Sequence, residues 1–339
     1  MKKVILLTSF SVTLLTVQAK IWRVNNVPGV TADFTTAQAA HNGAAANDTI
    51  YLESSPTSYG DLTTTKKLTW IGLGYFLPQN PGLQFHSNAG FVSGTLVSPG
   101  SDGSVFEFNQ SGFPGNFIIN SSSNITLLRC YIEGSVLING SSNHITITQS
   151  YLNVGNGTMN ISPSSQQFGF TITNNIIRTN QNIINQNAYQ VTFNNNTVFS
   201  GGNTPNNGNI YDNATIGNNI FYGVSTTTLY DAAYPSNVTN NLWVQYNNPT
   251  FVGTNGNIFT ANAATAFVLG SSPDGQYKLA AGSPAIGTGA GNVDMGAYGG
   301  ANPYVLSMIP AIPTIYRLAV PANATGSTLP STVSTRANN

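Results

Sequence analysis

Three stretches of eight residues decide the fold: "ITLLRCYI" (125–132), "ITITQSYL" (145–152) and "FTITNNII" (170–177). The phrase continues as "VTFNNNTV" from 191, "ATIGNNIF" from 214 and a shortened "VTNNLW" from 238, so successive copies begin 20 to 25 residues apart. A period in the twenties with one strand phrase per period predicts a solenoid. A second apolar run in each period, such as "SVLI" (135–138), and corners of Asn, Gly and Ser favour a parallel β-helix.

Alternation within each copy assigns its side chains to two faces, because neighbours along a strand point to opposite sides. Ile125 and Leu127, with their counterparts in later copies, are expected to point inward and stack coil on coil. The residues between them are expected to point outward and to form a column of threonines, with part of a second column beside it. These threonines are the candidate ligand-facing residues. The first column consists of Thr126, Thr146, Thr171, Thr192 and Thr215, and the second of Thr148 and Thr173. Leu128, Asn194 and Gly217 interrupt the second column.

One further position of the repeat lies where the chain leaves the strand, and it is occupied by Cys130, Ser150, Asn175, Asn196 and Asn219. Stacked Asn side chains can hydrogen-bond along a ladder of strands, so this position is interpreted as structural. Cys130 is accordingly expected to be a buried thiol rather than a nucleophile. The following position holds Tyr131 and Tyr151, but Ile176 comes next, so an aromatic platform for a sugar chain extends over two coils only.

The ends of a solenoid need covers, because each exposes a strand edge and an open core. The stretch "DFTTAQAAHNGAAANDTIYLE" (33–53) combines an Asp or Thr N-cap, an Ala-rich middle and a Gly and Asn stop, which predicts a short N-terminal capping helix. We expect "LTWIGLGYF" (68–76) to begin the coils. Two alternative folds are disfavoured. A leucine-rich repeat needs a framework of Leu residues, which this sequence does not have, and an antiparallel sandwich would show hairpin turns without a fixed period.

Both ends also carry a resemblance to a known group of proteins. "GSPAIG" (282–287) and "DMGAY" (294–298) resemble the last coils of secreted bacterial right-handed parallel β-helix proteins with a pectate-lyase-like fold. In that group an Asp is usual where this chain has Gly287. The opening, "WRVNNVPGVTADFTTAQAA" (22–40), is similar to the first coil and capping helix of the same group. The resemblance implies a single-stranded right-handed parallel β-helix and leaves the activity open.

The chain divides into three parts. Residues 1–19 have Lys2 and Lys3 before an apolar run that ends in "VQA", which predicts a secretory signal peptide cleaved after Ala19. Residues 20–302 are expected to form the β-helix with its N-terminal cap, and residues 303–339 a tail interrupted by prolines. The tail is expected either to lie along the β-helix or to act as a linker or docking segment. The mature protein is therefore expected at the cell surface, outside the cell or in the periplasm, without a membrane span.

Charge excludes several classes of partner. Charged residues make up 6% of the chain, and eleven basic side chains balance eleven acidic ones, so neither nucleic acid nor an anionic membrane is an expected partner.

His41, His86 and His144 are spaced too widely for a metal signature, and a lone His of this kind is expected at a surface or corner. No cofactor or metal is predicted, and the oligomeric state stays open.

Catalytic residues are sparse. Lyases of the resembling group need calcium-binding carboxylates near a base, and hydrolases need paired carboxylates, yet the chain has no Asp-Asp, Asp-x-Asp or Glu-x-Asp cluster. Arg178, Asp212 and Asp231 are the weak candidates for a catalytic site within the regular coils. The favoured function is an exported non-catalytic surface scaffold, adhesin or carbohydrate-binding protein whose partner is a polysaccharide or cell-surface glycan. The alternatives are a polysaccharide lyase or glycoside hydrolase and, through the threonine column, ice binding.

Overall fold

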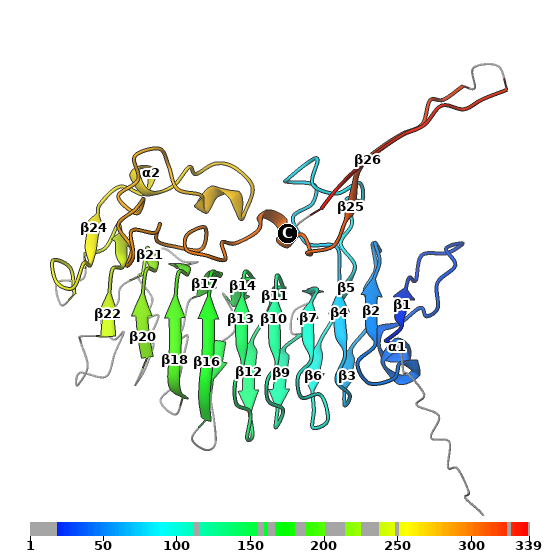
Figure 1. Cartoon of the computed structure of the whole chain (residues 1–339), viewed down its shortest axis with the longest axis horizontal. Helices are drawn as coiled ribbons and strands as arrows, with labels where there is room; N and C mark the ends of the chain where they lie inside the picture. Colours follow the sequence, from blue (N-terminus) through cyan, green and yellow to red (C-terminus); the bar gives the residue numbers. More distant parts are fainter. Residues whose placement is uncertain are drawn as a thin grey trace, which may run out of the picture.

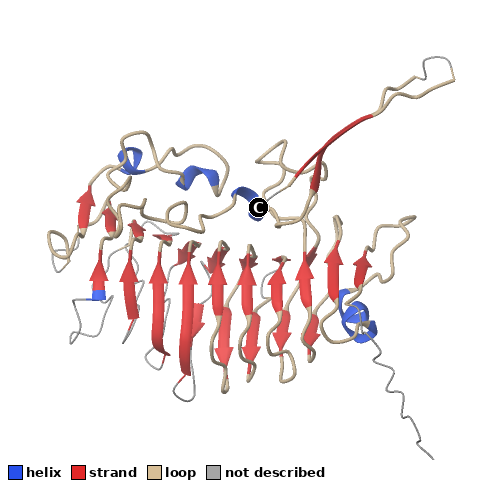
Figure 2. Cartoon of the chain, viewed as in Figure 1, coloured by secondary structure: helices blue, strands red, loops and turns tan. Residues whose placement is uncertain are grey.

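The computed structural model describes residues 19–111, 115–154, 159–161, 167–179, 188–200, 214–224, 237–247, 251–323 and 327–337. Within these ranges the strands form three parallel sheets and one antiparallel hairpin, so the chain is an all-β parallel solenoid with very little helix (Figures 1 and 2). The predicted signal peptide, apart from Ala19, lies outside the described residues. None of the helices in the described ranges has the length and apolar character that a membrane crossing needs.

Sheet A is the longest ladder. Its strands follow the order β1 (Ile21–Val24), β2 (Thr49–Leu52), β4 (Thr69–Ile71), β7 (Val105–Glu107), β10 (Thr126–Leu128), β13 (Thr146–Thr148), β16 (Gln167–Thr173), β18 (Ala188–Asn194), β20 (Ala214–Gly217) and β22 (Val238–Thr239). The coils therefore begin at Ile21, and the expectation that they begin at residue 68 is wrong. The cause is that β1 and β2 lie outside the recognisable repeat, although they pair with the sheet and place Val24, Ile50 and Leu52 in the core.

Two further sheets complete the coils, and in the described residues the smaller of them has strands in only five coils. Sheet C contains β5 (Phe91–Val92), β8 (Asn109–Gln110), β11 (Tyr131–Glu133), β14 (Tyr151–Val154), β17 (Ile176–Thr179), β19 (Thr197–Ser200), β21 (Ile220–Tyr222), β23 (Leu242–Val244) and β24 (Ile258–Thr260). Sheet B contains β3 (Leu62–Thr64), β6 (Thr95–Val97), β9 (Phe117–Asn120), β12 (Val136–Asn139) and β15 (Met159–Ile161). One coil thus passes through sheets B, A and C in turn, as β9, β10 and β11 do.

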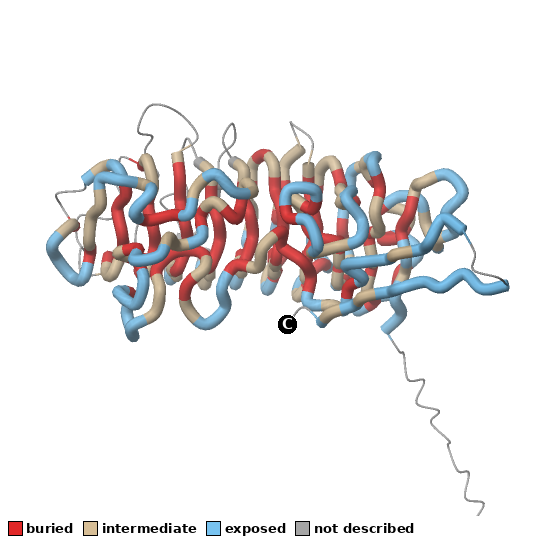
Figure 3. Tube along the Cα trace, turned by 90° about the horizontal axis from the view of Figure 1, so that it is seen from above, coloured by how far each residue is buried: buried red, intermediate tan, exposed pale blue. Residues whose placement is uncertain are grey.

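The core runs along the inside of the coils, as the view from above shows (Figure 3). Ile125, Leu127 and Ile172 are buried, as are their counterparts in the other copies, so the predicted inward positions are confirmed. Aromatic side chains fill the wider places, where Trp243 stacks on Phe221 with ring centroids 5.3 Å apart. Burial of a continuous apolar interior is what holds a solenoid of short strands together.

A short helix, α1 (Ala37–Gly43), follows β1 within the predicted helical stretch. The side chain of Thr36 accepts a hydrogen bond from the backbone nitrogen of Ala39 at 3.2 Å and so caps the first turn. Ala37 and Ala40 are buried against the core, and the helix packs on β1, β2 and β3.

The corner between sheets A and C carries a ladder of buried polar side chains, which we name the inner corner column: Cys130, Ser150, Asn175, Asn196, Asn219, Asn241 and Asn257. The backbone nitrogen of Asn196 donates to Oδ1 of Asn219 at 2.8 Å, and its Nδ2 donates to the carbonyl of Ile172 in the preceding coil at 2.8 Å. The same pattern is repeated from coil to coil, which confirms the structural role predicted for this position. The Cys130 thiol is buried as predicted, and burial raises its pKa to about 12.

After β24 the chain turns back and runs along the solenoid toward its N-terminal end (Figure 1). This return segment (263–311) contains α2 (Ala263–Ala266) and the 3-10 turns η2 (Gly275–Tyr277) and η3 (Leu306–Met308). It includes both "GSPAIG" and "DMGAY", so the expectation that these residues form the last coils is wrong. Within the described part of the chain they add no strand to the three sheets, and they cover the outer face of sheet C instead.

Two sets of contacts hold the return segment. The first set is made by the residues that come just before the inner corner column in each coil. These residues have a positive φ and turn their side chains outward: Arg129, Gln149, Asn174, Asn195, Asn218 and Asn240. Asn174 Nδ2 donates to the carbonyl of Gly299 at 2.7 Å, and Arg129 Nη1 to that of Ile309 at 2.8 Å. The second is an apolar layer in which Tyr131 and Tyr151, the expected platform, are only 5% and 6% exposed.

The chain ends in an antiparallel hairpin of β25 (Thr314–Ala319) and β26 (Thr332–Arg336) that projects from the body (Figure 1). Its base touches the loop before β5: the backbone nitrogen of Phe85 donates to the carbonyl of Ile315 at 2.9 Å, and Arg336 Nη2 donates to that of Leu83 at 2.9 Å. The tail from residue 303 therefore has two parts, one packed along the coils and one projecting.

Candidate ligand-binding site

Of the three charged candidates from the regular coils, the structure describes only Arg178, so their joint role as a site stays a prediction. Asp212 and Asp231 lie outside the described residues. Arg178 lies on β17 and donates from Nη1 to Oδ1 of Asn153 at 3.2 Å. Among the residues that the structure describes, no group of three or more His, Cys, Asp and Glu side chains is placed to hold a metal ion.

The threonine columns have the predicted geometry. Thr126, Thr146 and Thr171 are aligned partners on neighbouring strands of sheet A, and the alignment continues through Thr192 and Thr215. Thr148 and Thr173 are also aligned, and the Thr173 hydroxyl donates to Thr148 Oγ1 at 3.2 Å. Leu128 and Asn194 flank this pair in the same row, as the sequence indicates. The columns form a regular surface, and their contact with a ligand stays a prediction.

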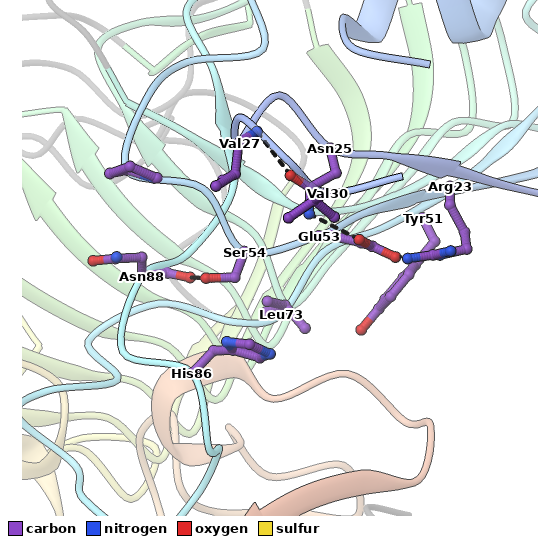
Figure 4. A pocket seen from close by; sticks show the side chains of 11 residues that line it. Arg23, Asn25, Val27, Val30, Tyr51, Glu53, Ser54, Leu73, His86 and Asn88 are labelled. Carbon is purple, nitrogen blue, oxygen red and sulfur yellow. Dashed lines mark hydrogen bonds and ion pairs between the residues drawn. The ribbon is translucent and has the colours of Figure 1, made fainter. Parts of the chain in front are cut away.

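A pocket of about 630 Å³ lies beside the first coils, between the outer face of sheet A and the loops that follow β1, follow β2 and precede β5 (Figure 4). Its polar lining residues are Arg23, Asn25, Tyr51, Glu53, Ser54, His86 and Asn88. Val27, Val30 and Leu73 supply apolar surface. The volume falls within the range of roughly 300–1,000 Å³ that is usual for small-molecule sites.

Strand register explains how the first wall of the pocket is built. Arg23 on β1 and Tyr51 on β2 are aligned partners and both point outward, because Val24 and Leu52 next to them point into the core. Glu53 follows β2 directly, and its Oε1 forms an ion pair with Arg23 Nε. The other carboxylate oxygen of Glu53 accepts from Asn25 Nδ2 at 2.9 Å. Figure 4 shows these side chains together on one side of the cavity.

The charges of the residues that line this wall balance each other. The charge of Glu53, whose side chain is 15% exposed, is balanced by that of Arg23, whose side chain is 51% exposed. Burial, with a smaller contribution from Glu53, raises the pKa of Tyr51 to about 12. The Tyr51 phenol therefore keeps its proton at physiological pH and is available as a hydrogen-bond donor. Guanidinium, carboxylate, amide and phenol together offer both donors and acceptors to a polar ligand.

The opposite wall is the loop 83–90, which carries His86 and Asn88 (Figure 4). Ser54 Oγ donates to the Asn88 carbonyl at 2.7 Å, and Gln84 Nε2 to that of Leu73 at 3.3 Å. Gly90 closes the loop where it crosses β2: a Cβ at this position would lie 2.2 Å from the Glu53 carbonyl oxygen. The C-terminal hairpin holds the other end of the loop through the contacts of Leu83 and Phe85. The wall is thus fixed from both ends.

The histidines have different environments. His86 is an exposed pocket residue and His144 an exposed corner residue, as predicted for a lone His. His41 is 4% exposed in α1, so the surface prediction is wrong for it. Its Nε2 accepts from the backbone nitrogen of Thr65 at 3.0 Å, and burial lowers its pKa, which favours the neutral acceptor form.

Sequence reasoning missed the pocket because it searched the repeats, whereas the pocket is built from coils that do not repeat. One signal was present in the sequence: Arg23 and Glu53 are charged residues beside strands in a chain with few charges. Comparison of the chain with protein-family models, with curated proteins and with solved structures gave no match.

Proposed function

We propose that this protein binds neutral saccharides without turning them over, and that the pocket between Arg23, Tyr51 and His86 is the binding site. The observation that carries the proposal is the lining of the pocket: a balanced ion pair, a protonated phenol and two amides stand next to apolar side chains. Sugars present adjacent hydroxyls that both donate and accept, together with apolar C–H faces. Sites for such ligands are concave, largely apolar and carry a few placed polar groups.

The ion pair favours a neutral ligand over a charged one. An anionic uronate would compete with Glu53 for Arg23, and a cationic ligand would compete with Arg23 for Glu53. Either exchange leaves one partner of the pair without its counter-charge, at a modest cost because the Arg23 side chain is half exposed. A neutral sugar can hydrogen-bond to both groups while the pair stays intact.

The lining also supports binding over turnover. Glu53 is the single acidic side chain among the described residues that line the pocket. Glycoside hydrolysis ordinarily uses two carboxyl groups, one on each side of the scissile bond. A hydrolase or lyase remains the alternative outcome of the experiment below.

Several wider features belong to the same proposal. The chain is exported after cleavage behind Ala19 and acts at the cell surface or outside the cell. The solenoid is right-handed, α1 covers its N-terminal end, and its architecture is that of the secreted bacterial pectate-lyase-like group. The threonine columns provide a second, uncharged surface for a glycan. N-terminal sequencing of exported protein tests the first point, with Lys20 as the expected first residue.

Calorimetric titration of the mature protein with glucose, mannose, galactose, xylose and galacturonate tests the proposal. We expect measurable heat of binding for at least one neutral sugar, at least tenfold weaker binding in Glu53→Gln and Tyr51→Ala, and no change in Asp61→Asn, which alters an exposed carboxylate outside the pocket. Binding of galacturonate alone, or no binding of any sugar, would refute a neutral-saccharide site.

Incubation with neutral and uronic-acid polysaccharides tests the absence of turnover. New reducing ends or unsaturated products that disappear in Glu53→Gln would establish an enzyme and overturn the non-catalytic proposal. Thermal hysteresis of the wild-type protein that disappears in a Thr146→Lys and Thr171→Lys variant would establish ice binding instead.

A further inference from the structure

A second compartment adjoins the pocket. It has a volume of about 360 Å³, and Pro56 and Asn88 line both compartments. Both of these side chains are exposed to solvent, so the boundary between the compartments lies at the surface. The two compartments are therefore neighbours along one groove rather than separate cavities.

Aromatic side chains form the wall of the second compartment. The rings of Tyr75 and Tyr131 stack with centroids 3.8 Å apart and an interplanar angle of 8°. Phe76 contacts Tyr131 edge to face, with centroids 5.4 Å apart. The backbone nitrogen of Tyr75 donates to the carbonyl of Ser307 in the return segment at 2.8 Å. Stacking and this hydrogen bond fix the Tyr75 ring before any ligand arrives, which lowers the entropy lost on binding.

The second compartment is uncharged. Its lining residues, as far as the structure describes them, are Ser, Pro, Tyr, Phe, Leu, Gln, Asn and Ala. Glu133 is not one of the lining residues; its carboxylate accepts a hydrogen bond from Oγ of Ser111, which is one, at 2.9 Å. Burial is the main cause that raises the pKa of Tyr75, so its phenol remains protonated. The compartment therefore combines aromatic surface with hydroxyl and amide groups and has no counter-charge for an ionised ligand.

We infer that the two compartments are consecutive subsites for one neutral oligosaccharide. One sugar unit binds between Arg23, Glu53 and Tyr51, the chain passes over Asn88 and Pro56, and a following unit binds beside Tyr75. This inference rests on the proposed function and makes it more specific: the ligand is a chain of at least two units rather than a free monosaccharide. Chain length, and not charge, then sets the affinity.

Titration with one to five units of the β-1,4-linked gluco-, manno- and xylo-oligosaccharide series tests the inference. We expect binding in one series to become at least about tenfold tighter between one and three units, because a fixed aromatic surface adds contacts for the later unit. Tyr75→Ala should remove this gain and leave the affinity for one unit unchanged. Tyr75→Phe, which keeps the ring, should retain most of it.

A second variant covers the risk that Tyr75→Ala disturbs the fold. Ser87→Trp places bulk in the second compartment from an exposed loop position and should also abolish the gain with chain length. Equal affinities for one and three units in the wild-type protein would overturn the inference and leave the proposed function standing. If no neutral sugar or oligosaccharide binds, the proposed function falls, and the inference with it.

Discussion

The side-chain amide of Asn80 donates to Oδ1 of Asp274 at 2.9 Å, although 194 residues separate them in the chain. Ser272 Oγ and the Gly275 nitrogen also donate to Oδ1, while the Ser307 nitrogen and the Tyr304 hydroxyl donate to Oδ2. The carboxylate is fully buried. It joins the loop after β4 to two distant parts of the return segment.

Loss of this carboxylate should release the return segment. Asp274→Ala leaves several buried donors without an acceptor, at a cost of about 3–5 kcal/mol. Hydrogen exchange of amides in residues 263–311 should accelerate far more than exchange in β10 or β13. Asp61→Ala, which removes an exposed carboxylate, should leave exchange unchanged. Uniform acceleration over the whole chain would show that the segment does not open by itself.

The inner corner column should be sensitive to single substitutions. Asn196→Ala removes the acceptor for the Asn175 backbone nitrogen and the donor to the Ile172 carbonyl, so two buried groups lose their partners. Each buried unpaired group costs about 1–3 kcal/mol, so thermal denaturation should occur several degrees lower. Asn143→Ala, at a partly exposed corner, is the control. Similar melting temperatures for both variants would contradict a stabilising ladder.

The loop wall of the pocket depends on close backbone approach at Gly90. In Gly90→Ala the new Cβ would meet the Glu53 carbonyl oxygen at 2.2 Å, so the loop must move away from β2. We expect saccharide affinity to fall at least tenfold. In Gly94→Ala the nearest atom is the Asp61 side-chain oxygen at 3.3 Å, which can move, so affinity should be retained. Calorimetric titration of both variants measures these affinities. An unchanged affinity in Gly90→Ala would show that loop 83–90 is not part of the binding site.

The stability of the folded protein is expected to depend on pH through Glu107. Residue 311 of the return segment packs against this side chain. Burial raises its pKa to about 7, although Arg129, 4.0 Å away, acts in the opposite direction. The folded state therefore binds this proton more tightly than the unfolded state. Its contribution to stability is complete below the ordinary pKa of about 4.3 and is lost as the pH rises through 7, by about 1–3 kcal/mol.

Thermal denaturation from pH 4 to pH 8 measures this contribution. Glu107→Gln should flatten the decline in melting temperature between pH 5 and pH 8, because the neutral amide does not titrate. Asp61→Asn should leave the decline as in the wild-type protein. A decline that persists unchanged in Glu107→Gln would assign it to another group that titrates in this pH range.

The repeats made much of the fold predictable. Ile145 and Thr146 could be assigned to opposite faces because alternation is strict, and the recurrence of Asn175 as Asn196 located the corner ladder. The return segment could not be predicted, because its residues follow no period and its polar contacts with the coils are made largely by backbone groups, which every residue has. Arg129 illustrates the difficulty: its role depends on a positive φ and on a partner 180 residues away. The pocket escaped prediction for the same reason.

The return segment also orders events while the chain is being made. In a simple solenoid each coil contacts only its neighbours and can fold as soon as it emerges. Here Tyr75, among the early coils, receives its backbone acceptor only when Ser307 arrives, and loop 83–90 is anchored only once Ile315 and Arg336 are in place. A chain interrupted before these residues can wind its coils but cannot finish the groove. Ligand recognition would thus report that synthesis has passed Arg336.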